Sequence, residues 1–193
     1  MLRRITMTMN ITMHGAGQEV GRSCIEVNWF DRRIIFDAGI KINPEQNEFP
    51  TVIDEPENVD ALFLSHAHMD HTGALPLLHH EGLRCPIFTT KPTKDITRVL
   101  LKDSWKIDRI ERRKKIYDKS CIKAVLDRMR LGEKGEYKGI KYQFFKAGHI
   151  PGAMSILLTY KGQKLLYSGD ISGTPHHIVN KYSRMPKADV LII

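Results

Sequence analysis

The run Ser-His-Ala-His-Met-Asp-His-Thr-Gly at residues 65–73 constrains this chain more than any other feature, because it holds His66, His68, Asp70 and His71 within six positions. Packed together, such side chains repel one another when the rings are protonated and lose hydration without compensation when they are neutral. A metal ion removes the conflict, since neutral imidazole and carboxylate are zinc ligands. We therefore expect a loop that points His66 and His68 at one ion and Asp70 and His71 at another.

Two later residues are further candidate ligands, because each ends a strand-like segment. His149 lies in the run Ala-Gly-His-Ile-Pro-Gly at 147–152, and Asp170 closes Tyr-Ser-Gly-Asp at 167–170. Either residue alone is a weak signal, since a histidine before proline and a Gly-Asp pair are both common in turns. Beside the histidine cluster both become candidates. Asp170 is the candidate bridge, because one carboxylate can span two cations about 3.5–4 Å apart.

The remaining histidines carry no comparable pattern. We expect surface or structural positions for His14, His79, His80, His176 and His177.

The periodicity of the first ninety residues predicts strands with one short helix. Apolar residues alternate with polar ones from Ile5 to Met13, the period of a half-buried strand. We expect further strands at 23–28 and 33–37 with a turn at Asp31-Arg32, a loop at 41–60, strands at 61–64 and 86–89, and between them a helix at 73–80 closed by Gly82.

The second half predicts helices followed by a second sheet. Apolar residues recur at helical spacing within 91–134, which indicates two amphipathic helices. Strands are expected at 139–145, 155–160, 164–168 and 190–193. The sequence contains no internal repeat, and 193 residues correspond to one domain, so the predicted class is α/β.

The positive charge is concentrated in the segment 91–134. The whole chain has a formal charge of +8, and this segment alone holds 15 Lys and Arg against 7 Asp and Glu, which is the entire excess. Its densest part, Arg109 and Arg112 to Lys115, is typical of surfaces that neutralise phosphates, so RNA is the expected partner. A solvated helix face is the alternative. Trp105 and Tyr117 are the only aromatic residues there, so base stacking is not strongly indicated.

The three cysteines are far apart and form no metal-binding pair, so neither a disulfide framework nor a cysteine zinc site is expected. No apolar run reaches the roughly 20 residues that cross a bilayer, and the alternating start is no signal peptide. We expect no membrane association and a cytoplasmic protein.

The order and spacing of His66-x-His68-x-Asp70-His71, His149 and Asp170 resemble the metallo-β-lactamase superfamily. Three further runs resemble its β-CASP branch: Gly-Ala-Gly-Gln-Glu-Val-Gly-Arg-Ser at 15–23, Phe-Asp-Ala-Gly at 36–39 and Gly-His-Ile-Pro-Gly-Ala at 148–153. That branch includes the nuclease subunit of the cleavage and polyadenylation specificity factor, its archaeal relatives and ribonuclease J. The resemblance implies an αββα sandwich and a zinc-dependent ribonuclease.

Carried over by position, the resemblance makes His66, His68 and His149 ligands of one zinc ion and Asp70 and His71 ligands of a second. Asp170 is then the bridge. Asp37 is not a direct ligand in this pattern but accepts a hydrogen bond from a ligand histidine, which fixes the ring's tautomer. Asp37, Asp70 and Asp170 are the candidate catalytic residues.

The chain also departs from the family pattern. In this family the second metal gains one more histidine after the β-CASP insertion, and an acidic residue follows the strand that here ends at Ile193. Neither lies within the 193 residues. We expect residues 1–193 to be the N-terminal portion of a metallo-β-lactamase domain, without the β-CASP domain and the C-terminal return.

The expected reaction is hydrolysis of RNA phosphodiester bonds by a dinuclear zinc site, in which a bridging water ionises near neutral pH and hydroxide attacks phosphorus. One alternative keeps the metals but acts on a small-molecule ester, thioester or lactone. A second alternative is an inactive scaffold fragment that binds RNA while a partner cuts it. The sequence does not decide the oligomeric state.

Overall fold

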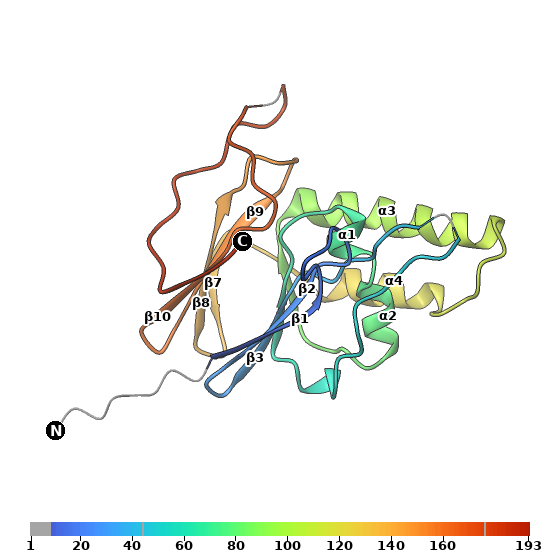
Figure 1. The fold of residues 1–193 in the computed structure, drawn as a ribbon, viewed down its shortest axis with the longest axis horizontal. Coiled ribbons are helices and arrows are strands. Elements are labelled where there is room, and N and C mark those ends of the chain that lie inside the picture. Colours follow the sequence, from blue (N-terminus) through green and yellow to red (C-terminus); the bar gives the residue numbers. More distant parts are fainter. Residues whose placement is uncertain (1–8, 44, 176) are drawn as a thin grey trace.

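The computed structural model describes residues 9–43, 45–175 and 177–193. Within these ranges two β-sheets pack face to face, and α-helices cover the outer face of the first sheet (Figure 1). One apolar cluster lies between the helices and the first sheet, and a second lies between the two sheets. The layers are therefore helix, sheet and sheet.

The first sheet has the order β1-β2-β3-β4-β5-β6. Its antiparallel part consists of β1 (Met9–Gly15), β2 (Cys24–Trp29) and β3 (Arg32–Phe36). Its parallel part adds β4 (Ala61–Phe63), β5 (Ile87–Thr89) and β6 (Met129–Leu131). Apolar residues of β3 to β5 contribute to both clusters, so these central strands are covered on both faces.

The helices follow β4 and β5. A 3-10 turn (Pro56–Asn58) precedes β4, and α1 (Met69–Thr72) and α2 (Leu75–His80) follow it. The long helix α3 (Lys91–Ile110) and the shorter α4 (Lys119–Arg128) lie side by side between β5 and β6 (Figure 1). Thr90 begins α3 as its N-cap and accepts from the backbone N–H of Thr93.

The second sheet has the order β11-β10-β9-β8-β7. It is built from β7 (Lys134–Tyr137), β8 (Ile140–Lys146), β9 (Met154–Tyr160) and β10 (Gln163–Tyr167) as an antiparallel meander. The last strand, β11 (Val190–Ile192), pairs in parallel with β10. Both predicted ligands outside the histidine run lie at ends of these strands: His149 after β8 and Asp170 after β10.

The predicted α/β class and the second sheet are confirmed. Three layers of the expected αββα sandwich are observed, and no helix lies on the outer face of the second sheet within the described ranges. The three cysteines are unpaired and buried. No described helix has the length and apolarity needed to cross a membrane.

Several predicted boundaries were wrong. The two helices predicted within 91–134 are confirmed, but β6 and the first residue of β7 also lie inside this segment and were not predicted. Both are exposed edge strands, so charged residues break the alternation that reveals a strand. The turn between β2 and β3 is at Phe30 and Asp31 rather than Asp31-Arg32. Part of the first predicted strand, before Met9, lies outside the described residues.

Candidate metal centre

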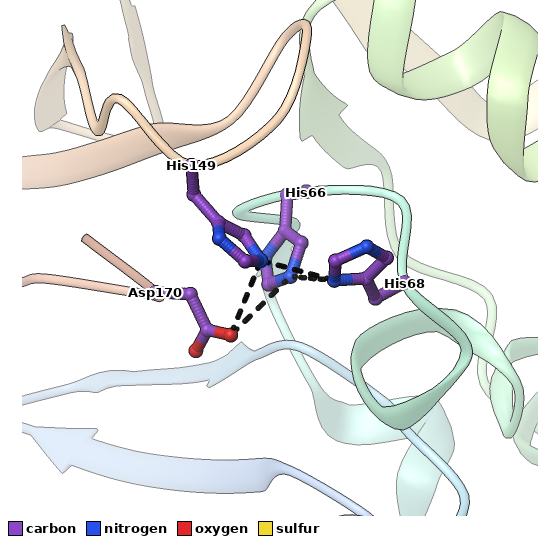
Figure 2. A group of neighbouring side chains, drawn as sticks. All are labelled: His66, His68, His149 and Asp170. Carbon is purple, nitrogen blue, oxygen red and sulfur yellow. Dashed lines mark hydrogen bonds and ion pairs between the residues drawn. The ribbon is translucent and has the colours of Figure 1, made fainter. Parts of the chain in front are cut away.

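Four predicted ligands meet where loops from both sheets converge. Figure 2 shows His66 and His68 on the loop after β4, with His149 and Asp170 facing them from the loops after β8 and β10. The nearest ligand atoms of all four residues lie within 4.8 Å of one another. Residues more than 80 positions apart in the sequence thus supply one donor set of three imidazoles and a carboxylate.

The distances within this set fit a tetrahedral ion. Zinc–ligand bonds of about 2.0–2.1 Å place neighbouring ligand atoms about 3.3 Å apart. His68 Nδ1 lies 3.2 Å from His66 Nε2 and 3.0 Å from His149 Nε2. A carboxylate oxygen of Asp170 lies 3.4 Å from His149 Nε2 and 3.8 Å from His66 Nε2. The four residues can therefore hold a cation with little movement.

The other predicted pair lies on the opposite side of the Asp170 carboxylate. Asp70 and His71 lie on the short helix α1, whereas the sequence pattern predicted a loop. His71 Nε2 is 3.4 Å from Asp170 Oδ1 and 3.8 Å from Asp70 Oδ2. Asp170 thus directs Oδ2 at His66 and His149 and Oδ1 at His71. That is the arrangement expected of a bridging carboxylate.

The orientation of His71 is fixed by Asp37, which is fully buried. Asp37 accepts from the backbone N–H and hydroxyl of Ser65, from Tyr167 Oη and from His71 Nδ1, each at 2.7 Å. Three of these bonds are made to Oδ2 and one to Oδ1, so this buried carboxylate accepts four hydrogen bonds. Because His71 donates from Nδ1, its neutral tautomer presents the lone pair of Nε2 to Asp70 and Asp170.

The same hydrogen-bond network fixes the tautomer of His66. The hydroxyl of Ser65 donates to Asp37, so it can only accept from His66 Nδ1, which is 2.9 Å away. The neutral ring of His66 then carries its lone pair on Nε2, toward His68 and Asp170. The neutral rings of His66 and His71 therefore both direct the lone pair of Nε2 into the same space, where a donor N–H or a metal ion can satisfy it.

The two buried rings differ in how readily they bind a proton. Burial lowers the pKa of His66 to about 3, and neighbouring His71 adds to this effect. Burial opposes protonation of His71 too, but Asp37 and Asp170 outweigh it and raise its pKa to about 10. The hydrogen bond from His71 holds the pKa of Asp170 at about 2. Asp37 and Asp170 thus favour a positive charge beside them, either a proton on His71 or a metal ion.

The backbone locks α1 against the segment that follows β3. Ala38 N–H donates to His71 O at 2.7 Å, and Ser23 N–H donates to Asp70 O at 2.8 Å. A Cβ on Gly39 would lie 1.6 Å from Asp70 O, so only glycine permits this approach. At the glycine-rich loop after β1, the two ends of the loop approach each other closely, since a Cβ on Gly15 would lie 2.0 Å from Arg22 O.

Sequence reasoning missed three residues of this network. Ser65, Tyr167 and Ser23 all connect to Asp37, with Ser23 Oγ 3.4 Å from Tyr167 Oη. Ser65 is the first residue of the histidine run, so a role for it could have been inferred from the sequence. Nothing in the sequence links Tyr167 to Asp37. Of the histidines expected to be structural, His14 bonds Glu26 and Thr51, and His79 lies 3.1 Å from Leu83 O. His176 lies outside the described residues.

Comparison with known proteins matches residues 32–193 to a family described as the beta-lactamase superfamily domain. The chain is 42% identical to "Probable RNase MJ4" of Methanocaldococcus jannaschii, over 84% of this chain and 39% of that protein. It is 34% identical to "Cleavage and polyadenylation specificity factor subunit 3" of Dictyostelium discoideum, over 96% of this chain and 25% of that protein. The chain thus spans less than half the length of these relatives.

Solved structures support the fold. The metallo-beta-lactamase fold protein YhfI from Bacillus subtilis aligns with a TM-score of 0.50 at 17% identity, over 83% of this chain and 62% of that protein. At this identity the likeness concerns the fold alone.

Proposed function

The chain belongs to the β-lactamase superfamily, in its β-CASP branch, and on this premise we propose that it is a metal-dependent ribonuclease. The observation that carries the proposal is the Asp170 carboxylate, whose two oxygens face two separate groups of ligands. Support for RNA as the substrate comes from the names of relatives, which include "Ribonuclease TTHA0252" of Thermus thermophilus and "Endoribonuclease ysh1" of Schizosaccharomyces pombe.

We propose two zinc ions, one held by His66, His68, His149 and Asp170 and one by Asp70, His71 and Asp170. Imidazole and carboxylate without thiolate suit zinc at both positions. When bound, zinc lowers the pKa of a coordinated water and neutralises charge on phosphate oxygens.

The chain's own residues contribute orientation and proton acceptance. Asp37 and Ser65 hold His71 and His66 in the tautomers that leave Nε2 free. Asp70 and Asp170 are the more open members of the centre, with 37% and 45% of their side chains exposed. An exposed carboxylate beside buried ligands can take the proton of the attacking water, so we assign that role to Asp70 or Asp170.

The charge distribution favours RNA over a small ester. The cations of 91–134 extend along α3 and α4 and the loop between them, and most of them are exposed. Hydrolysis of a small ester gives no reason for such a surface. RNA binding should weaken steeply as salt rises, whereas binding that is flat with salt would favour the small substrate.

The test is cleavage of a labelled single-stranded RNA by the protein and by its Asp70→Asn variant. Loss of a catalytic carboxylate should reduce cleavage about 100-fold or more. The matched control is Glu136→Gln on β7, which removes one exposed carboxylate elsewhere and should retain activity. Full activity of Asp70→Asn would contradict the assignment of Asp70 as a catalytic residue. RNA binding without any cleavage would favour the scaffold alternative.

The cellular location follows from the cysteines. Three buried, unpaired thiols support a reducing compartment, and we propose the cytoplasm.

A further inference from the structure

A cavity of about 350 Å³ lies at the end of α3 remote from the metal centre. The near end of α3 is fixed beside the metal centre, because Thr90 and Thr93 donate to the carbonyl of Gly152, three residues after His149. Trp105, which lines the cavity, is 15 residues further along α3, or about 22 Å at 1.5 Å per residue. In Figure 1 this end of α3 and the start of α4 lie at the edge of the molecule.

The cavity has an aromatic wall. The two aromatic residues of 91–134, Trp105 from α3 and Tyr117 from the following loop, both line it. Trp105 is half-buried and packs partly against the apolar core, and Tyr117 is buried. The ring of Trp105 thus has a fixed position with one part open to the cavity.

Unpaired cations surround this ring. The Arg109 guanidinium lies 5.0 Å and the Lys119 ammonium 5.1 Å from the ring centroid of Trp105. Lys114 is exposed on the cavity's rim. Within the described part of the chain none of these three side chains has a carboxylate partner, whereas Arg113 is paired with Asp108 and Glu111. The cavity is thus positively charged as well as aromatic.

We propose that this cavity is a second nucleic-acid-binding site, which takes one nucleotide of single-stranded RNA with its base against Trp105 and its phosphates on Arg109, Lys114 and Lys119. The proposal rests on the proposed function for its choice of ligand. Proteins that bind single strands combine an aromatic stacking surface with a cationic path for the backbone, and both occur here.

Binding requires only the exposed cations to move. Arg109 and Lys119 are exposed, and an exposed cation–π contact is weaker than stacking of a base on an aromatic ring. A base can therefore replace a cation on Trp105, while the displaced side chain gains a phosphate oxygen. Lys94, Arg98 and Lys102 line a separate hollow between α3 and α4, nearer the metal centre, and Lys119, whose ammonium lies over the ring of Trp105, lines that hollow too. They offer phosphate contacts between the two sites.

The experiment is fluorescence titration of the protein with a short oligouridylate in the presence of a chelator, so that binding is measured without cleavage. Trp29 is fully buried and bonded to Gln163, so a quenched signal reports Trp105. We expect quenching of Trp105 in the unaltered protein. Because Trp105→Leu lacks this reporter, its affinity is measured from the fluorescence anisotropy of the same oligouridylate carrying a dye, and we expect about a tenfold loss. Trp105→Phe, which keeps an aromatic ring, should recover most of the affinity.

Charge variants supply the matched comparison. Lys114→Ala on the cavity rim should lower the slope of log affinity against log salt by about 0.7, the value for one phosphate contact of a single strand. Lys141→Ala removes an equal, exposed charge from β8, outside both the segment 91–134 and the cavity, and should leave the slope nearly unchanged.

The proposal would be overturned if RNA bound without quenching Trp105, or if the protein and Trp105→Leu bound RNA with equal affinity. Quenching by an acidic polypeptide but not by RNA would also overturn it and assign the cavity to a protein partner. RNA cleavage by the metal-loaded protein is a separate readout. Its loss would reject the proposed function while leaving a binding result at Trp105 intact.

Discussion

The metal centre and the α3–α4 surface use charged side chains in opposite ways. At the centre, Asp37 is buried and accepts four hydrogen bonds, which fix the orientation of His71 directly and that of His66 through Ser65. On the α3–α4 surface, Lys102, Lys114 and Lys119 are exposed and have no carboxylate partner among the described residues. The first region therefore depends on geometry and the second on the number of charges. Substitutions should separate the two.

The largest effect is expected for Asp37→Asn. The amide directs N–H groups at side chains that already donate, which leaves buried donors unsatisfied and removes the charge facing His71. We expect a loss of about 3–5 kcal/mol in the free energy of unfolding, measured by urea denaturation with a chelator present. Tyr167→Phe removes only one donor and should cost about 1 kcal/mol. Equal losses in the two variants would contradict the central role of Asp37.

A second substitution tests the connection between the two regions. Gly152 has a φ of +85°, and a Cβ there would lie 2.8 Å from Thr90 Oγ1 and Thr93 N. Gly152→Ala should therefore cost about 2–4 kcal/mol and weaken metal binding, because His149 is three residues away. Gly162 has a φ of +82° with nothing within 4 Å of the same position. Gly162→Ala should show only the backbone penalty of about 1 kcal/mol and unchanged metal affinity.

A third test uses a buried charged group without a metal role. Burial alone would raise the pKa of Glu26, but hydrogen bonds from Arg33, His14 and Asn28 outweigh it and hold the pKa below its usual value. The unfolded chain then binds the proton more readily, so this stabilisation is complete above about pH 4.3 and is lost as pH falls toward the folded pKa.

Glu26→Gln should accordingly lower stability by about 1–3 kcal/mol near pH 7, with a difference that shrinks as the pH drops. Urea denaturation at several pH values measures this, and Glu136→Gln on the exposed strand β7 serves as the control. A difference that grows toward acid would contradict the lowered pKa.

The smallest effect is expected on the α3–α4 surface. Lys102→Ala removes one exposed, unpaired charge and should leave the melting temperature unchanged. It should lower the salt slope of RNA binding by about 0.7. A variant with a changed melting temperature but an unchanged slope would assign Lys102 to structure rather than to RNA binding.

Most of the candidate metal centre could be predicted from the sequence because four of its six candidate ligands fall in one short, dense run. His66, His68, Asp70 and His71 need no long-range information to be recognised as ligands, and His149 and Asp170 gained weight from their order behind that run. The structure brings all six together. Tyr167 could not be found, since its bond to Asp37 spans 130 residues and no local pattern reports it.

The fold was predictable where burial sets a clear period and not where strands are short and exposed. The apolar runs of β4 and β5 and the alternation of β2 identified their strands. The edge strand β7 contains Lys134, Gly135 and Glu136, all exposed, so its pairing with β8 decides its structure rather than its residues. The cavity around Trp105 was also beyond the sequence, because it depends on how the loop after α3 folds back.

Metal content, measured by native mass spectrometry of the protein and of Asp170→Ala, tests the central claim most directly. The account predicts two zinc ions on the protein and loss of zinc from Asp170→Ala, because the carboxylate of Asp170 faces both groups of ligands. A folded protein that retains no zinc, or an Asp170→Ala variant that binds as much zinc as the unaltered protein, would contradict it.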